Sequence, residues 1–147
     1  MPRFVFKLES VLRLRVHAEQ KRQRELAEAQ RRITELQGEL DAVEREVGEA
    51  TAQLRDKLAA ARIDPRWLLL HAHHMQSLRA RSSAISEEMF QAGLAVETAQ
   101  EALVVACAER KSLEKLRQKQ HEQHDLMQER GERVVLDEIA ARGFLQD

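Results

Sequence analysis

The sequence predicts an all-α fold, a long antiparallel two-helix coiled-coil hairpin. The first observation is composition: 33% of the 147 residues are charged, 3% are aromatic, and there are five Gly and two Pro. Such chains form long helices or coiled coils rather than compact globules. The second observation is a repeat of apolar residues, with gaps alternating between three and four, on both sides of Pro65. The third is Pro65 itself, which divides this repeat into two helices.

The first helix is expected to span about residues 4–61. Its N-terminal part, from Phe6 to Val16, carries a broader apolar surface than a two-helix seam requires. A regular heptad pattern then follows over four heptads, which indicates a coiled-coil seam. The members of this pattern are Leu26, Ala29, Ile33, Leu36, Leu40, Val43, Val47, Ala50 and Leu54.

Residues 62–66 are predicted to form the turn. The residue before a proline is disfavoured in the α region, so the first helix should end before Pro65. Pro is well suited to the first position of a new helix, and Asp64 before it is a good N-cap.

The second helix is expected to span about residues 67–141, with Gly143 as a possible C-cap. Its heptad positions are Leu68, His71, Met75, Leu78, Ser82, Ile85, Met89, Ala92, Val96, Ala99, Leu103, Ala106, Arg110 and Leu113. Antiparallel pairing should bring together residues whose numbers sum to roughly 130, such as Leu40 and Met89. Residues 1–147 are thus predicted to be one coiled-coil domain, a rod with both termini far from the turn.

A two-helix rod offers no pocket, phosphate loop or sheet edge, so we predict a protein that is not an enzyme and has no cofactor. His71 and His74 share a helix face, as do His121 and His124, but no Cys or acidic residue completes a zinc site beside them. Cys107 is expected to be a small apolar filler next to the seam. We therefore predict no catalytic residue and no metal.

The net charge is −1, but the N-terminal part of the first helix is basic. A nucleic-acid-binding hairpin is one hypothesis for these basic residues, but no aromatic side chains interleave them, so the favoured reading is that nucleic acid is not a partner. The single Cys fits a reducing compartment. No apolar run is long enough to span a bilayer, and the N-terminus lacks a signal-peptide core, so a cytoplasmic location is expected.

Apolar residues are in excess at both expected ends of the rod. Phe4, Phe6 and Leu8 lie near one terminus and Val134 to Phe144 near the other, while Trp67 to Leu70 follow the turn. Excess apolar surface of this kind is typical of docking sites, so the rod is predicted to connect partners. A coiled-coil scaffold that self-associates through the terminal end is the alternative hypothesis.

Three segments resemble signatures of the FliJ family of the bacterial flagellar type III export apparatus. They are Phe6–Arg15 (FKLESVLRLR), Glu109–Leu116 (ERKSLEKL) and Leu136–Ala140 (LDEIA). Their order and spacing, together with the length and two-helix layout, carry the resemblance over the whole chain. The stalk proteins of virulence-type secretion systems share the architecture and are a further alternative.

The resemblance implies a fold similar to the rotor stalk of rotary ATPases. It also implies a non-enzymatic stalk and general chaperone component that inserts into the hexameric export ATPase ring and promotes its assembly. The implied partners are that ATPase, the membrane export gate and export chaperones. The implied location is the cytoplasmic face of the cell membrane at the flagellar base, with peripheral association through partners.

Particular residues follow from the same resemblance. The contacts to the ATPase ring are expected from Phe6, Leu8, Leu12, Arg13, Leu136, Asp137 and Glu138. The contacts to the export gate are expected from Trp67, Leu70, His74 and Leu78.

Overall fold

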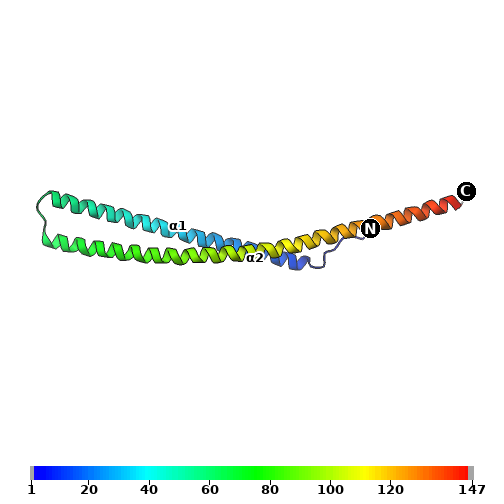
Figure 1. The fold of residues 1–147 in the computed structure, drawn as a ribbon, viewed down its shortest axis with the longest axis horizontal. Helices are drawn as coiled ribbons and strands as arrows, with labels where there is room; N and C mark the ends of the chain where they lie inside the picture. Colours follow the sequence, from blue (N-terminus) through cyan, green and yellow to red (C-terminus); the bar gives the residue numbers. More distant parts are fainter. Residues whose placement is uncertain (1, 146–147) are drawn as a thin grey trace. The chain divides into compact units, whose positions relative to one another are not determined.

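The computed structural model describes residues 2–145 and contains two helices, α1 (Glu9–Ala59) and α2 (Pro65–Leu145), shown in Figure 1. No strand occurs in the described residues. The two helices pack against each other in antiparallel order, which confirms the all-α hairpin. Their contacts group into two compact units. Unit 1 joins the residues up to Lys21 with those from Leu103 onward, and unit 2 is Arg22–Ala102.

The chain before α1 is not helical, although the helix was expected to begin near residue 4. Residues 2–6 form an N-terminal arm that runs along α2, with the Phe6 side chain only 6% exposed. The Glu9 N–H donates to the Phe6 carbonyl at 3.2 Å, and the Leu12 N–H donates to the Leu8 carbonyl at 2.9 Å. The arm thus buries an aromatic ring against α2, and α1 begins directly after it.

The bend between the helices carries well-formed caps. The Ala60 N–H donates to the Asp56 carbonyl at 3.1 Å, and Ala61 has a φ of 58°, the left-handed conformation that commonly ends helices. On the other side, the Asp64 carboxylate accepts the Arg66 N–H at 3.0 Å, and the Asp64 carbonyl accepts the Leu68 N–H at 3.1 Å. The predicted N-cap at Asp64, with Pro65 at the first helical position, is therefore confirmed.

An aromatic cluster ties the two helices together at the bend. The Trp67 ring stacks on the His71 ring, with centroids 5.1 Å apart and an interplanar angle of 18°. The Lys57 Nζ lies 5.3 Å from the centroid of the same Trp67 ring, so the last turn of α1 makes a cation–π contact with the first turn of α2.

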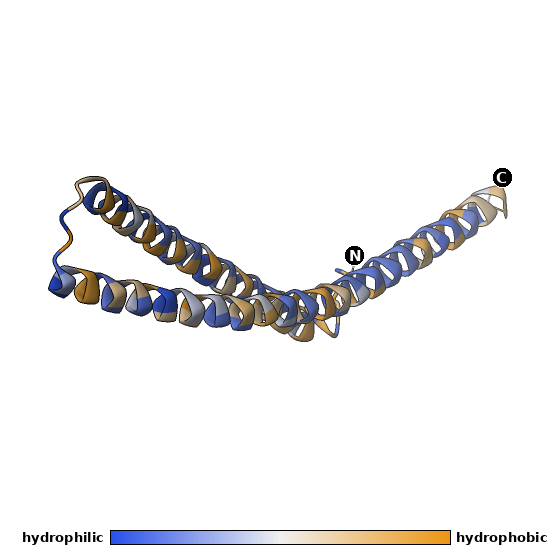
Figure 2. Cartoon of the chain, turned by 60° about the vertical axis from the view of Figure 1, so that its left-hand side comes forward, coloured by the Kyte–Doolittle hydropathy of each residue, from blue (hydrophilic) through white to orange (hydrophobic). Residues whose placement is uncertain are grey.

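The core of unit 2 is the predicted heptad seam. Leu36 and Val43 of α1 are fully buried with Leu78 and Ile85 of α2, and the flanking positions Leu40, Val47, Met75, Met89 and Ala92 pack against them. Apolar and polar residues alternate around each helix (Figure 2). Every α1 seam position from Leu26 to Leu54 is buried or half-buried, as the period predicts.

The register differs from the predicted one by about one helical turn. Val43 and Val47 line the same shallow groove as Leu78 and Ser82, so numbers that sum to about 125 face each other. The cause is the position of the bend. Because α1 ends at Ala59 and α2 begins at Pro65, the bend is centred two residues before the middle of the predicted turn 62–66.

Unit 1 is built differently from unit 2. Its buried apolar residues are Phe6, Leu12 and Ala106, and ion pairs between the start of α1 and the middle of α2 accompany them. Its α2 portion continues to Leu145, the last residue that the structure describes.

Candidate functional site

The C-terminal segment of α2, residues 129–145, is called here the bare segment because its side chains are open to water. Every residue of this segment is exposed. It carries six large apolar side chains, namely Val134, Val135, Leu136, Ile139, Phe144 and Leu145. Leu136 is 64% exposed and Phe144 still more so. Uncovered apolar side chains at this density mark a surface that another molecule covers.

The N-terminal arm explains where this bare segment begins. The Gln128 side-chain amide donates to the Pro2 carbonyl at 2.9 Å, and Pro2 is the first residue that the structure describes. Phe4 packs against His121 at 4.8 Å and His124 at 5.6 Å between ring centroids. The arm therefore covers α2 as far as Gln128, and the exposed segment follows directly after it.

The two histidines under the arm have packing roles. The His121 Nδ1 lies 3.1 Å from the Asp125 carboxylate one turn later. The His124 Nδ1 is buried without a hydrogen-bond partner, because its distance of 3.9 Å to Asp125 is too long for one. In residues 2–145 no group of three His, Cys, Asp or Glu side chains is placed to hold a metal ion.

A shallow groove connects the arm with the bare segment. Its walls come from Pro2 of the arm and from neighbouring residues on one side of α2, namely His124, Met127, Gln128, Gly131, Glu132, Val135 and Leu136. The groove is mostly apolar, with Met127, Val135 and Leu136 as its large side chains. It is a hollow into which an apolar side chain of a partner would fit.

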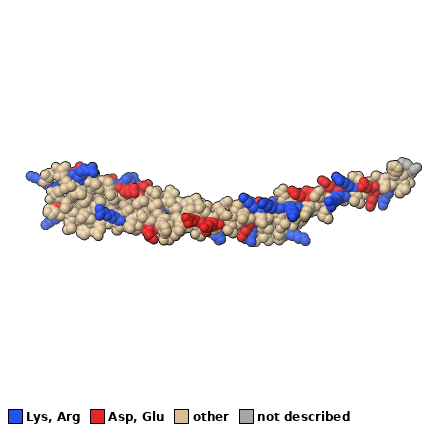
Figure 3. Space-filling view, in the orientation of Figure 1, with Lys and Arg blue, Asp and Glu red and all other residues tan. Residues whose placement is uncertain are grey.

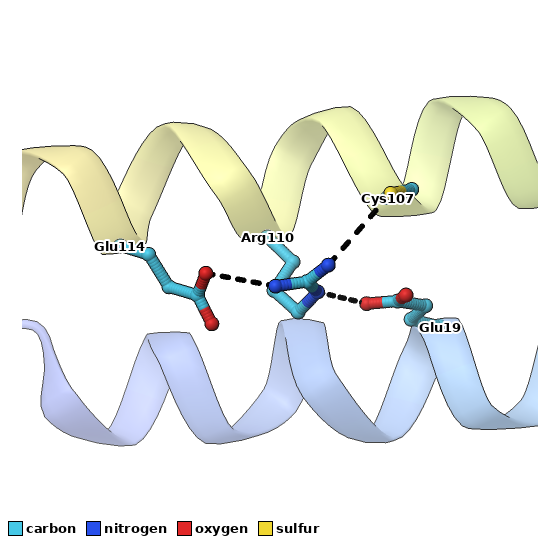
Figure 4. Close-up of polar contacts among 4 residues, drawn as sticks. All are labelled: Glu19, Cys107, Arg110 and Glu114. Atoms are coloured by element: carbon cyan, nitrogen blue, oxygen red, sulfur yellow. Dashed lines mark hydrogen bonds and ion pairs between the residues drawn. The ribbon is translucent and has the colours of Figure 1, made fainter.

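An ion-pair cluster occupies a seam position of unit 1 (Figure 4). Arg110 reaches across from α2 to Glu19 of α1, and it also donates to Glu114 at 2.8 Å and to the Cys107 Sγ at 3.8 Å. The hydrogen bonds that Arg110 donates to Glu19 and then to Glu114 raise the pKa of Arg110 above its ordinary value. Arg110 therefore remains charged and fixes which residue of α1 it faces.

Exposed ion pairs flank this cluster. Arg15 pairs with Glu109 at 2.6 Å, and Arg117 pairs with Glu9 at 3.5 Å. Arg22 and Arg32 also have acidic partners. Several arginines of the basic N-terminal part are thus occupied, and on the visible face Lys and Arg are mixed with Asp and Glu rather than gathered in one patch (Figure 3).

The sequence model of the flagellar FliJ protein family matches residues 4–147. The chain belongs to this family. It is therefore a component of the flagellar protein-export apparatus. No curated protein and no solved structure is found to match it. No helix in residues 2–145 combines the length and apolar character needed to cross a bilayer.

The residues that the FliJ resemblance assigns to the ATPase ring all lie in unit 1, but they divide by exposure. Leu136, Asp137 and Glu138 lie on the bare segment, and Leu8 and Arg13 are also exposed. Phe6 and Leu12 are only 6% and 4% exposed. These two hold the arm and the first turns of α1 against α2, so their side chains are not free to touch a partner.

The residues assigned to the export gate divide in the same way. Leu70 is 69% exposed and His74 is exposed, while Trp67 is half-buried under Lys57. Leu78 is 3% exposed and belongs to the core of unit 2, so its assignment as a direct contact is corrected. The reason is its heptad position, which directs it into the seam.

The structure also reveals residues that sequence reasoning missed. Glu19 lies in a wholly polar stretch that gave no reason to single it out, and its role depends on Arg110, ninety-one residues away. Gln128 is likewise an ordinary polar helix residue in the sequence, and His124 stood out there only as half of a possible metal-binding pair with His121. Their contacts exist because the arm is extended rather than helical.

Proposed function

We propose that this FliJ-family chain is the stalk of the flagellar export ATPase. In this proposal the bare segment of α2, with Leu136, Asp137 and Glu138, enters the hexameric ATPase ring together with the exposed Leu8 and Arg13 of α1. The stalk promotes assembly of the ring and links it to the membrane export gate. It is a non-catalytic component, since ATP is hydrolysed by the ring and not by the stalk.

One observation carries the proposal for the ring: a C-terminal helix segment with six exposed large apolar side chains in a member of this family. Burying a side chain such as Leu or Ile contributes roughly 1.5–3 kcal/mol, so covering even a few of them gives a ring substantial binding energy. The interleaved Asp137 and Glu138 keep the segment soluble before it binds. They also offer carboxylates to basic side chains inside a ring.

The proposed gate surface lies at the bend. Leu70 and His74 are one turn apart on the same side of α2 and both are exposed, and Leu69 beside them is exposed as well. The Lys57–Trp67–His71 cluster and the caps at Ala61 and Asp64 hold the bend in one shape. A preformed surface loses less entropy on binding than a mobile loop. Export chaperones are further proposed partners, and the proposed location is the cytoplasmic face of the membrane at the flagellar base.

Two matched substitutions test the two surfaces against each other. Leu136→Asp should weaken binding to the purified export ATPase at least tenfold and remove any stimulation of its ATP turnover, because a charge replaces an apolar contact. Leu70→Asp should leave ATPase binding unchanged and weaken binding to the cytoplasmic domain of the export gate. Both side chains are exposed, so both variants should keep the wild-type helix content by circular dichroism.

Each variant is the control for the other. The proposal fails if the wild-type chain neither binds the ATPase nor changes its turnover. It also fails if Leu136→Asp and Leu70→Asp weaken both partners equally.

A further inference from the structure

We propose that one exposed flank of α2 in unit 2 is a symmetric docking surface for a second copy of this chain, with Phe90 on the two-fold axis. The surface, called here the outer stripe, is an exposed flank of α2 beside the seam, and its Arg79 and Ser83 border a shallow groove together with Val43 and Glu44 of α1. It consists of Arg79, Ser83, Ser86, Phe90, Leu94, Glu97 and Glu101.

The outer stripe is a single helix face and it is open to solvent. The spacing of its members is four, three, four, four, three and four, which keeps all seven on one side of a helix. None of them is a seam residue, and all seven are exposed. Phe90 is 63% exposed, and Leu94 one turn later is exposed as well. Neither Phe90 nor Leu94 belongs to the core cluster of unit 2 or packs against it.

The charges of the stripe are also without partners. Arg79, Glu97 and Glu101 make no ion pair or side-chain hydrogen bond to any other residue in 2–145. Between Glu88 and Glu97 the helix carries no charged residue at all. The stripe is therefore an apolar centre, with a basic residue at one end and two acidic residues at the other.

This arrangement is complementary to itself in antiparallel order. The spacing reads the same in both directions from Phe90, so a two-fold axis there places Arg79 of one copy opposite Glu101 of the other, and Ser83 opposite Glu97. Each pair occurs twice. Phe90 meets the Phe90 of the second copy, and Leu94 fits over the small Ser86. A parallel arrangement would instead bring the glutamates of both copies together, and like charges disfavour it.

The size of the stripe sets the strength of the contact. At ~1.5 Å per residue the stripe is about 33 Å long, and with a helix width of ~10 Å the pair would bury roughly 700 Å² in total. Interfaces below about 1,200 Å² are weak and transient. We expect a monomer–dimer equilibrium that becomes visible at high micromolar concentration or where many copies are held at one place.

Reversing the charges of the proposed Arg79–Glu101 pair tests whether the chain dimerises through the outer stripe. Sedimentation equilibrium of the full chain between 10 µM and 1 mM, in low salt, should show reversible dimers. Arg79→Glu and Glu101→Arg, each alone, should raise the dimer dissociation constant at least fivefold. The double variant R79E/E101R should restore it to within about twofold of wild type, because each reversed pair is again opposite in sign. Phe90→Ser should abolish dimers.

Matched controls separate this surface from others. Arg55→Glu reverses an exposed arginine of α1 that has no ion pair in the described residues, and it should not change the equilibrium. Leu136→Asp tests association through the bare C-terminal segment, and it should also have no effect. A strictly monomeric chain at 1 mM overturns the proposal. So does a double variant that fails to regain dimers, or dimers that disappear with Leu136→Asp.

Discussion

Arg110 shows how a single residue shapes this protein. It occupies a seam position between Ala106 and Leu113, where an apolar side chain would be the default. A charge there is tolerated because Glu19 and Glu114 both accept its hydrogen bonds. Because its pKa is raised rather than lowered, the Arg110 side chain stays charged at physiological pH. Such a pair specifies which layers of the seam face each other more than it adds stability.

Ala61 is the residue with an unfavourable backbone. Its φ of 58° is the conformation that Gly adopts freely and that costs a residue with a Cβ about 1 kcal/mol. We therefore expect Ala61→Gly to stabilise the chain by about 1 kcal/mol in urea unfolding. Ala60→Gly is the control, since positive φ among the non-Gly residues of the described chain occurs at Ala61 alone. Equal effects of the two substitutions on the free energy of unfolding would show that the left-handed conformation of Ala61 does not lower stability.

At the scale of the elements, the helices depend on their seam rather than on intrinsic preference. The outward faces of α1 are highly charged, and the buried surface is one narrow row of side chains per helix. Each layer of unit 2 therefore contributes a large share of the stability of that unit. The bend adds caps at both sides, which stop α1 and start α2 at defined residues.

Leu36 is the seam residue whose truncation should destabilise unit 2 most, because its side chain is fully buried in the core of that unit. Leu36→Ala should cost about 3 kcal/mol, within the range of large-to-small substitutions in cores. Leu58→Ala, an exposed leucine of the same helix, should cost well under 1 kcal/mol. Thermal and urea unfolding followed by circular dichroism measures both. A similar cost for the two would mean that the seam around Leu36 does not hold unit 2 together.

At the scale of the whole molecule, α2 is far longer than α1, with 81 residues against 51. The arm compensates for part of the difference by covering α2 up to Gln128. Every residue of the remaining segment, 129–145, is exposed. Most helical stability in proteins comes from tertiary packing, so this exposed end of α2 should be less stable in the free chain than the packed part of the same helix.

Amide hydrogen exchange should differ between the exposed end of α2 and the part of α2 that packs in the core of unit 2. The amides of residues 132–145 should exchange far faster than those of residues 75–92, which lie in the core of unit 2. Binding of the export ATPase should slow exchange in 132–145. Equal protection of the two stretches in the free chain would contradict the view that the C-terminal segment lacks support.

Much of the fold could be predicted from the sequence because it depends on local sequence patterns. The heptad positions from Leu26 to Leu54 and the N-cap at Asp64 are confirmed. Each rests on a spacing of three or four residues or on one dipeptide. The second helix begins at Pro65, two residues before the expected bound. The candidate contact residues remain predictions, and they differ in exposure: Leu136 and Leu70 are exposed, whereas Phe6, Leu12 and Leu78 are buried. A family motif does not distinguish a residue that touches a partner from one that supports its neighbours.

The sequence by itself determined that this is a two-helix hairpin of the FliJ family, because periodicity, composition and terminal motifs are properties of the chain alone. The tertiary structure decided the register, the extended arm and the pairing of Arg110 with Glu19. The physical reason is that these features depend on contacts between residues up to 126 positions apart. A shift of two residues at the bend changes every such pairing along the seam and leaves the heptad pattern of each helix unchanged.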